Sequence, residues 1–157
     1  MPGDTSVTEE ALDSRDRRFL VVDDIGLGRS LLQAILGPYG QVETADSADS
    51  AMSIYRDTLA AGHVFDLALL DIMMPGVDGL ELFDRLRAYE ESQGVPSVPV
   101  VMTTALDQKS YVYAAAQRGA VGYLVKPLRP DQVRACLRQL GLLTETPSPR
   151  DTGAKRG

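Results

Sequence analysis

Four short apolar runs, each followed by a polar residue, constrain the fold of this chain more than any other feature. They cover residues 19–22, 67–70, 98–102 and 121–125. Apolar runs of this length are typical of strands that are buried on both faces of a parallel sheet. Amphipathic helical patterns fill the stretches between them, and this alternation is typical of βαβ units. The sequence therefore predicts an α/β protein with a parallel sheet at its centre.

The complete pattern predicts five strands and five helices in alternation. Right-handed crossovers permit the strand order 2-1-3-4-5, a doubly wound, flavodoxin-like sheet with helices on both faces. The expected strands lie near residues 19–23, 41–45, 66–71, 98–103 and 121–125, and the expected helices near 27–37, 48–61, 79–92, 108–118 and 130–140. The apolar stripe expected on the first helix consists of Leu31, Leu32, Ile35 and Leu36.

Individual residues mark the ends of several predicted helices. Ser47 and Asp107 are suited to cap the helices that follow them, because their side chains accept hydrogen bonds from free backbone N–H groups. Pro130 suits the first turn of the last helix. Gly26 and Gly28 loosen the start of the first helix, because glycine is a poor helix former.

The length and composition fit one domain with polar tails. With 157 residues, of which 44% are hydrophobic, the chain can build one core and is too short for two domains of ordinary size. Residues 1–16 are polar and aperiodic, and residues 144–157 are rich in Pro, Ser, Thr and Gly, so both are predicted to be disordered, the second as a tail or linker. The folded domain is expected to cover residues 17–143.

Charge and residue usage argue against several classes of function. The net charge of −6 provides no basic surface for direct binding of nucleic acid or of an anionic membrane. No apolar stretch approaches the ~20 residues that span a bilayer, and the N-terminus lacks the pattern of a secretory signal, so the expected location is the cytoplasm. The single Cys136 leaves no thiol pair for a disulfide or a metal, and its helical spacing with Val133 and Leu137 predicts a packed position. His63 is also alone, and a structural or merely exposed role is expected.

Polar residues with chemical potential follow the predicted strands. Asp23 and Asp24 follow the first apolar run, Asp71 ends the third expected strand, Thr104 follows the fourth and Lys126 follows the fifth. Ligands of open α/β sheets collect at the carboxyl ends of the strands, so these side chains are expected to converge. Three carboxylates that close raise one another's pKa unless a cation is bound, and Mg²⁺ prefers such oxygen ligands. Each residue also has an ordinary alternative role, as a solvated turn, a helix cap or a surface charge.

The same residues and their neighbours carry a family resemblance. The motifs are the acidic pair Asp23–Asp24, residues 71–79 (DIMMPGVDG), the Thr104–Ala105 step and residues 122–127 (GYLVKP). Over residues 17–143 the chain resembles the receiver domain of two-component response regulators, and four motifs in the correct order are a strong signal. The resemblance implies a phosphoacceptor that is served by a histidine kinase or a phosphotransfer protein. It would be a signalling domain and no enzyme, beyond catalysing its own phosphorylation and dephosphorylation.

The resemblance also implies which residues bind a metal ion and the phosphoryl group. Asp71 would accept the phosphoryl group. Asp24 and Asp71 would bind Mg²⁺ directly, Asp23 through water, and Met73 through its main-chain carbonyl. Lys126 would neutralise one phosphoryl oxygen.

Further residues would read out the phosphorylated state. Thr104, the member of the Thr103–Thr104 pair that the resemblance selects, would bind a phosphoryl oxygen with its hydroxyl, as would the Ala105 amide. The family holds the peptide bond between the lysine and Pro127 in the cis form. Tyr123 would act as a switch that reshapes the face built by the fourth helix, fifth strand and fifth helix, and an ordinary packing role is the alternative. An unknown output protein or domain, and a phosphorylation-dependent dimer, are the expected partners.

Rival functions lack required residues. Haloacid-dehalogenase-like phosphatases carry a general acid two residues after the nucleophile, where this chain has Met73, which cannot donate a proton. A flavodoxin-like binder of small molecules would need a phosphate-binding loop after the first strand. In receivers the positions of Met73 and Leu106 border the path of the attacking water. Neither side chain offers that water a hydrogen bond, so the resemblance implies slow self-dephosphorylation unless both side chains point to solvent. Residues 89–97 predict a long loop with an acidic start, to which the sequence assigns no function.

Overall fold

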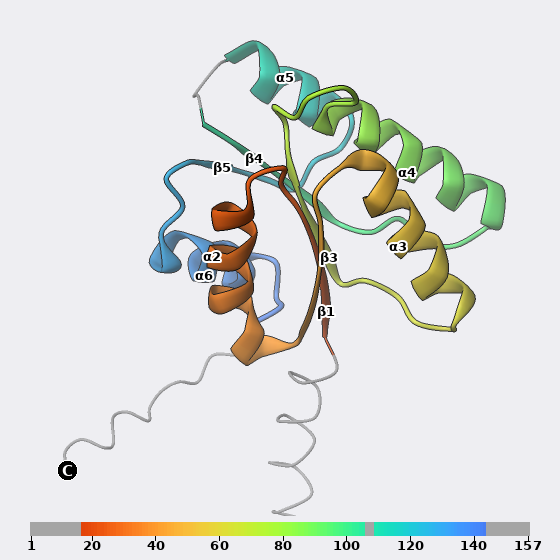
Figure 1. Cartoon of the computed structure of the whole chain (residues 1–157), viewed down its shortest axis with the longest axis horizontal. Coiled ribbons are helices and arrows are strands. Elements are labelled where there is room, and N and C mark those ends of the chain that lie inside the picture. Colours follow the sequence, from red (N-terminus) through yellow and green to blue (C-terminus); the bar gives the residue numbers. More distant parts are fainter. Residues whose placement is uncertain (1–16, 106–108, 144–157) are drawn as a thin grey trace, which may run out of the picture.

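The computed structural model describes residues 17–105 and 109–143. In this part of the chain a five-stranded parallel sheet has the order β2-β1-β3-β4-β5, as predicted (Figure 1). The strands are β1 (Arg18–Val22), β2 (Gln41–Ala45), β3 (Leu67–Asp71), β4 (Val100–Thr104) and β5 (Gly122–Val125). The helices are α2 (Gly26–Leu36), α3 (Ala48–Ala60), α4 (Gly79–Gln93), α5 (Lys109–Gln117) and α6 (Pro130–Gln139), with a short 3₁₀ helix, η1 (Gly37–Tyr39). The predicted tails, residues 1–16 and 144–157, and the predicted cap at Asp107 lie outside the described residues.

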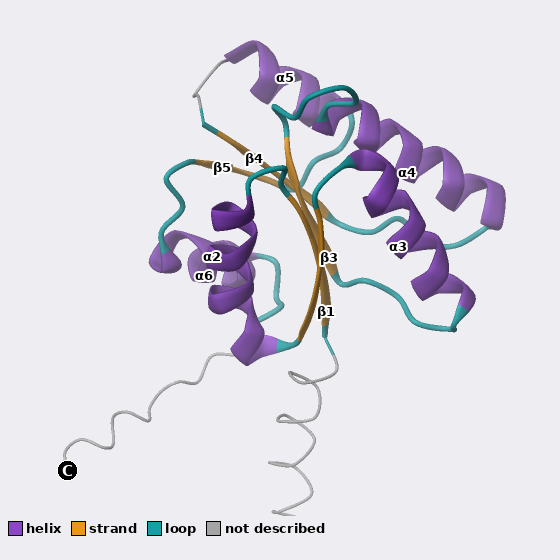
Figure 2. Cartoon of the chain, viewed as in Figure 1, coloured by secondary structure: helices purple, strands orange, loops and turns teal. Residues whose placement is uncertain are grey.

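Helices cover both faces of the sheet. Figure 2 shows α2 and α6 on one side of the strands and α3, α4 and α5 on the other. Side chains alternate along each central strand, so that in β1 Leu20 and Val22 join the core under α3 and α4, whereas Phe19 and Val21 join the core under α2 and α6. All residues of β3 and β4 are buried, which explains their continuous apolar sequence.

Several predicted helix signals are confirmed. The Ser47 side chain accepts a hydrogen bond from the Ser50 N–H at 3.1 Å and caps α3. Pro130 is the first residue of α6. The prediction for Leu31 was wrong, because this side chain is 39% exposed while the other members of the predicted stripe on α2 are buried. It lies to one side of the stripe that faces the sheet.

The connection between α4 and β4 covers residues 94–99. Helix α4 continues to Gln93 and ends at Gly94, whose positive φ of 67° forms a left-handed cap. Strand β4 begins only at Val100, because the Val98 N–H donates to the Glu90 side chain at 2.8 Å and Pro99 has no N–H for strand pairing. The helix predicted over residues 79–92 is therefore confirmed, and the loop predicted for residues 89–97 was wrong for residues 89–93, which belong to α4.

Glu90 anchors this connection from the buried face of α4. Its carboxylate is 1% exposed and accepts hydrogen bonds from the Tyr55 hydroxyl at 2.5 Å, the Val98 N–H at 2.8 Å and the Arg87 guanidinium at 2.9 Å. Tyr55 comes from α3, so one carboxylate joins α3, α4 and the approach to β4. Burial and the adjacent Glu90 raise the pKa of Tyr55, which keeps its hydroxyl protonated as a donor.

None of the helices within the described ranges combines the length and the apolar character that a membrane crossing requires.

Candidate functional site

The register of the sheet brings the predicted site residues to one edge. Val22 lies beside Leu70, Asp71 beside Thr103, and Thr104 beside Val125. Asp23 and Lys126, which follow β1 and β5, therefore leave the sheet at the same edge as Asp71. The Lys126 N–H also donates to the Thr104 carbonyl at 2.6 Å, which ties the end of β5 to the end of β4.

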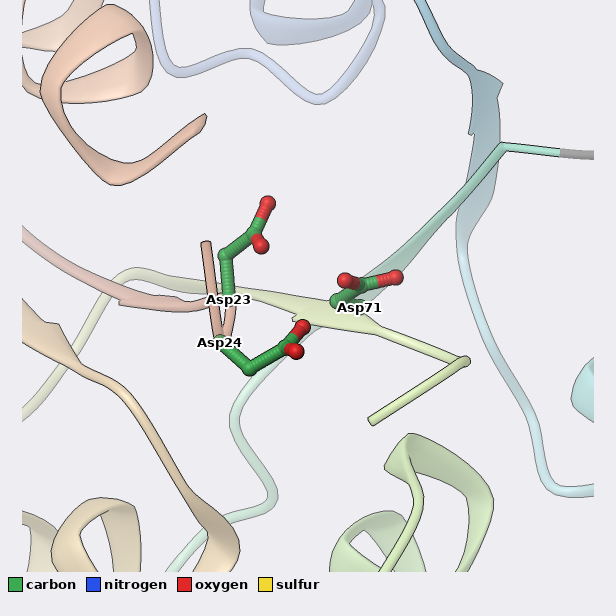
Figure 3. A group of neighbouring side chains, drawn as sticks. All are labelled: Asp23, Asp24 and Asp71. Carbon is green, nitrogen blue, oxygen red and sulfur yellow. The ribbon is translucent and has the colours of Figure 1, made fainter. Parts of the chain in front are cut away.

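Three carboxylates form an acidic cluster at this edge. Asp23, Asp24 and Asp71 each offer an oxygen that lies within 4.8 Å of the others (Figure 3). Asp23 and Asp71 are buried and Asp24 is half-buried. Within the described residues no other group of three acidic, histidine or cysteine side chains gathers in this way.

Lys126 opposes the acidic cluster. Its Nζ donates to Asp23 Oδ2 at 2.8 Å and to Asp71 Oδ2 at 3.2 Å. Burial alone would lower the pKa of Lys126, but the hydrogen bonds to the two carboxylates and their negative charge more than offset it, so the pKa is raised above its ordinary value. Lys126 is therefore a charged ammonium at neutral pH. The peptide bond between Lys126 and Pro127 is cis, as the resemblance implied.

Asp71 is the carboxylate with the least favourable surroundings. Its pKa is raised to about 6, because burial and, to a smaller extent, the negative charge of Asp23 raise it by more than the charge of Lys126 lowers it. Its Oδ1 accepts a hydrogen bond from the Met73 N–H at 3.3 Å. An additional cation would stabilise the ionised form.

The chemistry of the cluster fits a hard divalent cation. Asp24 makes no hydrogen bond or ion pair with any residue that the structure describes, so its carboxylate is available as a ligand. Carboxylate oxygens, a main-chain carbonyl and water are the ligands that Mg²⁺ takes in proteins. Met73 follows Asp71 by two residues, and its bonded N–H holds its main chain beside the cluster.

The other predicted residues occupy the same edge or its margin. Thr104 is fully buried at the end of β4, and Ala105, which follows it, is exposed. Tyr123 lies in β5 beside Met102 and is partly buried against the core under α3 and α4. The Met73 side chain is 48% exposed, and Leu106 lies outside the described residues, so the predicted shielding by this pair stays a prediction.

Two glycines permit the close approach of helices to the site. At Gly79, the first residue of α4, an added Cβ would lie 2.2 Å from the Asp71 carbonyl oxygen, so only glycine fits there. At Gly28, in the first turn of α2, an added Cβ would lie 2.4 Å from Asp23 Oδ2. The sequence pattern had suggested only that Gly28 loosens the helix.

Sequence reasoning also missed Arg29. Its guanidinium Nη1 donates to the Asp23 carbonyl oxygen at 2.7 Å and fastens the start of α2 to the turn that carries the acidic pair. The available signal was its position one turn into the helix, six residues after Asp23, but a basic residue at that place is also compatible with a solvated face.

Cys136 and His63 take no part in the site. Cys136 is partly buried against the core under α2 and α6, and burial raises the pKa of its thiol, as expected for a packed cysteine. His63 is exposed, and its N–H donates to the Thr58 carbonyl at 3.1 Å.

A 2-1-3-4-5 parallel sheet with three carboxylates and a lysine at its carboxyl edge defines the class of CheY-like domains with the flavodoxin fold. The family model of the response regulator receiver domain matches residues 19–138, so the chain belongs to the response regulator receiver family. It is therefore a receiver domain of two-component signalling, homologous to CheY proteins and to the receiver domains of histidine kinases.

Individual relatives agree with this family. The sensor protein GacS of Pseudomonas syringae pv. syringae is 31% identical over 140 residues, which cover 88% of this chain and 15% of that protein. The chemotaxis protein CheY-3 of Vibrio cholerae is 33% identical over 118 residues, which cover 75% of this chain and 86% of that protein. Among solved structures, the receiver domain of the histidine kinase CKI1 from Arabidopsis thaliana, complexed with Mg²⁺ and BeF₃⁻, has a TM-score of 0.71 and 28% identity, and the match covers 86% of this chain and 96% of that one.

Proposed function

We propose that Asp71 accepts a phosphoryl group from a phosphohistidine of a sensor histidine kinase or a phosphotransfer protein. The observation that carries this proposal is the position of Asp71 between an acidic cluster and the Lys126 ammonium, 3.2 Å from Asp71 Oδ2. With a pKa of about 6 the carboxylate is mostly ionised at neutral pH. It is therefore available as a nucleophile.

The proposed reaction is a displacement at phosphorus. A carboxylate oxygen of Asp71 forms a bond to phosphorus while the bond between phosphorus and the imidazole nitrogen of the donor breaks. The imidazole leaves with the electron pair of that bond and takes up a proton. Such transfers depend on alignment and on neutralisation of the phosphoryl oxygens more than on covalent chemistry from the protein.

The acidic cluster is the proposed Mg²⁺ site. Asp24 and Asp71 would bind the ion directly, Asp23 through water, and Met73 through its main-chain carbonyl. When bound, Mg²⁺ supplies positive charge next to a phosphoryl oxygen. The absence of a protein partner for Asp24 among the described residues supports its assignment as a direct ligand.

Lys126, Thr104 and Ala105 would hold the remaining phosphoryl oxygens. The ammonium of Lys126 already contacts the Asp71 carboxylate and would remain beside the oxygens that phosphorylation adds. The backbone hydrogen bond from Lys126 to Thr104 keeps these two residues together at the edge of the sheet. In this proposal the domain promotes only its own phosphorylation and dephosphorylation and has no other substrate.

The proposed output surface is the face of α5, β5 and α6. Strand β5 is the least buried edge of the sheet, and a groove of about 520 Å³ lies between it and α6. Tyr123 comes from this strand, two residues before Val125, which pairs with Thr104, and would change position when Thr104 binds a phosphoryl oxygen. The partner is an output protein or domain, or a second copy of the chain after phosphorylation. Direct contact with nucleic acid or membrane is not expected, and the cytoplasm remains the predicted location.

Incubation with a small phosphodonor and Mg²⁺, followed by intact mass measurement, tests the assignment. The wild-type chain should gain one phosphoryl group, and Asp71→Asn should gain none. Asp57→Asn is the matched control, because Asp57 is exposed on α3 and its side chain has no partner among the described residues. Acid-stable label on Asp71→Asn would place the phosphoryl group on a hydroxyl and refute the assignment. Continuous release of phosphate from many substrates would indicate a phosphatase instead.

A further inference from the structure

Gly28 lies in the first turn of α2, beside the carboxylate of Asp23. An added Cβ at this position would lie 2.4 Å from Asp23 Oδ2 and 3.0 Å from Asp23 Cγ. Carbon and oxygen atoms that are not bonded to each other do not approach so closely. A side chain at position 28 and the present position of the Asp23 carboxylate therefore exclude each other.

Both oxygens of Asp23 are engaged in this position. Oδ2 accepts from Lys126 Nζ at 2.8 Å, and Oδ1 accepts from the Ile25 N–H at 2.9 Å. The residue is 1% exposed, so these partners replace water. Figure 3 shows that the Asp23 carboxylate nevertheless stays near those of Asp24 and Asp71. We refer to this arrangement as the Lys126-paired position of Asp23.

The Lys126-paired position competes with a divalent cation. An ion that attracts the Asp23 carboxylate, directly or through water, needs oxygens that are now bonded to Lys126 and to the Ile25 amide. Charge-assisted hydrogen bonds of this kind are the stronger ones in proteins. Any interaction that favours this position in the metal-free protein therefore lowers the affinity for the ion.

We propose that Gly28 is a positioning residue for the cation site, because it leaves room for the Lys126-paired position of Asp23 and so lowers the affinity of the receiver for Mg²⁺. The inference rests on the proposed Mg²⁺ site. According to this inference, the glycine in the first turn of α2 weakens the binding of the metal ion to this chain.

The clash would displace the carboxylate and leave the helix in place. The atoms nearest to the added Cβ belong to the rotatable end of the Asp23 side chain. Helix α2 is held by the buried side chains of Leu32 and Leu36 and by the hydrogen bond from Arg29 to the Asp23 carbonyl at 2.7 Å. Alanine is also a better helix former than glycine, so Gly28→Ala is expected to fold.

The experiment compares two glycine-to-alanine variants of the full chain in the same helical turn. An added Cβ at Gly26 would meet nothing closer than the flexible Arg29 Nη2 at 3.4 Å, so Gly26→Ala is the matched control. Isothermal titration with Mg²⁺ alone, without a phosphodonor, measures affinity. Gly28→Ala should bind roughly tenfold more tightly than Gly26→Ala and the wild type, as expected when one charge-assisted hydrogen bond is lost from the metal-free state.

Nuclear magnetic resonance of the metal-free variants provides an independent measurement. The Ile25 amide resonance should lose the signature of its hydrogen bond in Gly28→Ala and keep it in Gly26→Ala. In an Asp23→Ala background, which removes the displaced side chain, Gly28→Ala should no longer change the affinity. The proposal would be overturned if Gly28→Ala bound Mg²⁺ no more tightly than the control, or if its effect on affinity survived in the Asp23→Ala background. It would also be overturned if Gly28→Ala did not fold, or if neither variant bound Mg²⁺.

The outcome is separable from the proposed phosphoacceptor function. If the wild-type chain is labelled on Asp71 while Gly28→Ala and Gly26→Ala bind Mg²⁺ equally, the positioning role of Gly28 is wrong and the function stands. If Gly28→Ala binds Mg²⁺ more tightly while no phosphodonor labels Asp71, the positioning role of Gly28 stands and the proposed phosphoacceptor function is wrong.

Discussion

Two buried carboxylates, Glu90 and Asp71, differ in how completely their surroundings satisfy them. Glu90 accepts three hydrogen bonds of 2.5 to 2.9 Å, from Tyr55, Arg87 and the Val98 N–H. Asp71 accepts two longer ones, of 3.2 and 3.3 Å, and burial raises its pKa to about 6.

The difference separates a structural carboxylate from a chemical one. A buried charge with all its hydrogen bonds made contributes to one fixed arrangement of the chain, here the junction of α3, α4 and β4. A buried charge with few and long hydrogen bonds retains a capacity to bind something else, and perturbed carboxylates of this kind are candidates for functional sites. Both residues are acidic and buried, so burial alone does not distinguish them.

The largest expected effect is the loss of the structural carboxylate. Glu90→Ala would leave the Tyr55 hydroxyl and the Val98 N–H buried without an acceptor, and the free energy of unfolding should fall by about 4 kcal/mol. Chemical denaturation measures it. Glu91→Ala is the control, because Glu91 is exposed on the same turn of α4, and its loss should stay within about 0.5 kcal/mol. Similar losses of unfolding free energy for the two variants would mean that the hydrogen bonds of Glu90 do not stabilise the protein more than an exposed carboxylate does.

Replacing the basic residue that pairs with each carboxylate, Lys126 at Asp71 or Arg87 at Glu90, should change the stabilisation by Mg²⁺ only at Asp71. Without metal, Lys126→Met leaves Asp23 and Asp71 buried without their ammonium and should cost about 3 kcal/mol of unfolding free energy. Mg²⁺ should stabilise this variant more than it stabilises the wild type, because no ammonium competes for the carboxylates. Thermal unfolding with and without Mg²⁺ measures both effects.

The control for this experiment is Arg87→Met at the other carboxylate. Arg87 pairs with Glu90 at 2.9 Å, far along α4 from the acidic cluster. The stabilisation that Mg²⁺ provides to this variant should equal that of the wild type. A larger gain in Arg87→Met than in Lys126→Met would contradict the distinction between the two sites.

The two carboxylates also differ in how far the sequence predicted them. Asp23, Asp24 and Lys126 follow strands and Asp71 ends one, so the strand order was enough to bring them to one edge. Glu90 lay both at the end of the predicted helix 79–92 and at the acidic start of the predicted loop 89–97, and the sequence pattern assigned it no role. Its spacing of four residues from Leu86 and seven from Phe83 places it on the buried face of α4, and this helical period was the available signal.

What the sequence could not provide are contacts between side chains that are distant along the chain. The bond between Tyr55 and Glu90 joins residues 35 positions apart, and nothing in either local pattern indicates the other. The close approach of Gly28 to Asp23 depends on how α2 docks on the sheet, which a helix propensity does not describe. Element types follow from local periodicity, and the strand order follows from crossover handedness together with the family resemblance. These side-chain contacts follow only from the packed structure.

The raised pKa of Asp71 predicts a pH dependence of stability in the metal-free protein. The ordinary value is 3.8 and the folded value is about 6, so folding takes up a proton in this interval. The free energy of unfolding should therefore fall as the pH rises from about 4 to about 7, and the wild type should lose about 2 kcal/mol relative to Asp71→Asn over this range. Urea unfolding in the presence of a chelator measures the difference. Asp57→Asn should follow the wild type, and parallel curves for wild type and Asp71→Asn would contradict the prediction.

The smallest expected effect concerns one donor of the structural carboxylate. Tyr55→Phe removes the hydroxyl that donates to Glu90 at 2.5 Å and leaves the ring, which stacks on Phe65 with centroids 5.7 Å apart, in place. Arg87 and the Val98 N–H still bind Glu90, so the loss should be that of one hydrogen bond to a charged group, about 1.5 kcal/mol. Tyr89→Phe is the matched control, since the Tyr89 ring meets Tyr55 edge-on at 6.2 Å but its hydroxyl bonds to no residue in the described part of the chain. In a Glu90→Ala background the Tyr55→Phe substitution should lower the free energy of unfolding by a smaller amount, because the hydroxyl has already lost its acceptor. An unchanged cost in that background would show that the Tyr55 hydroxyl stabilises the protein through some other contact, and that Glu90 is less fully satisfied than its geometry indicates.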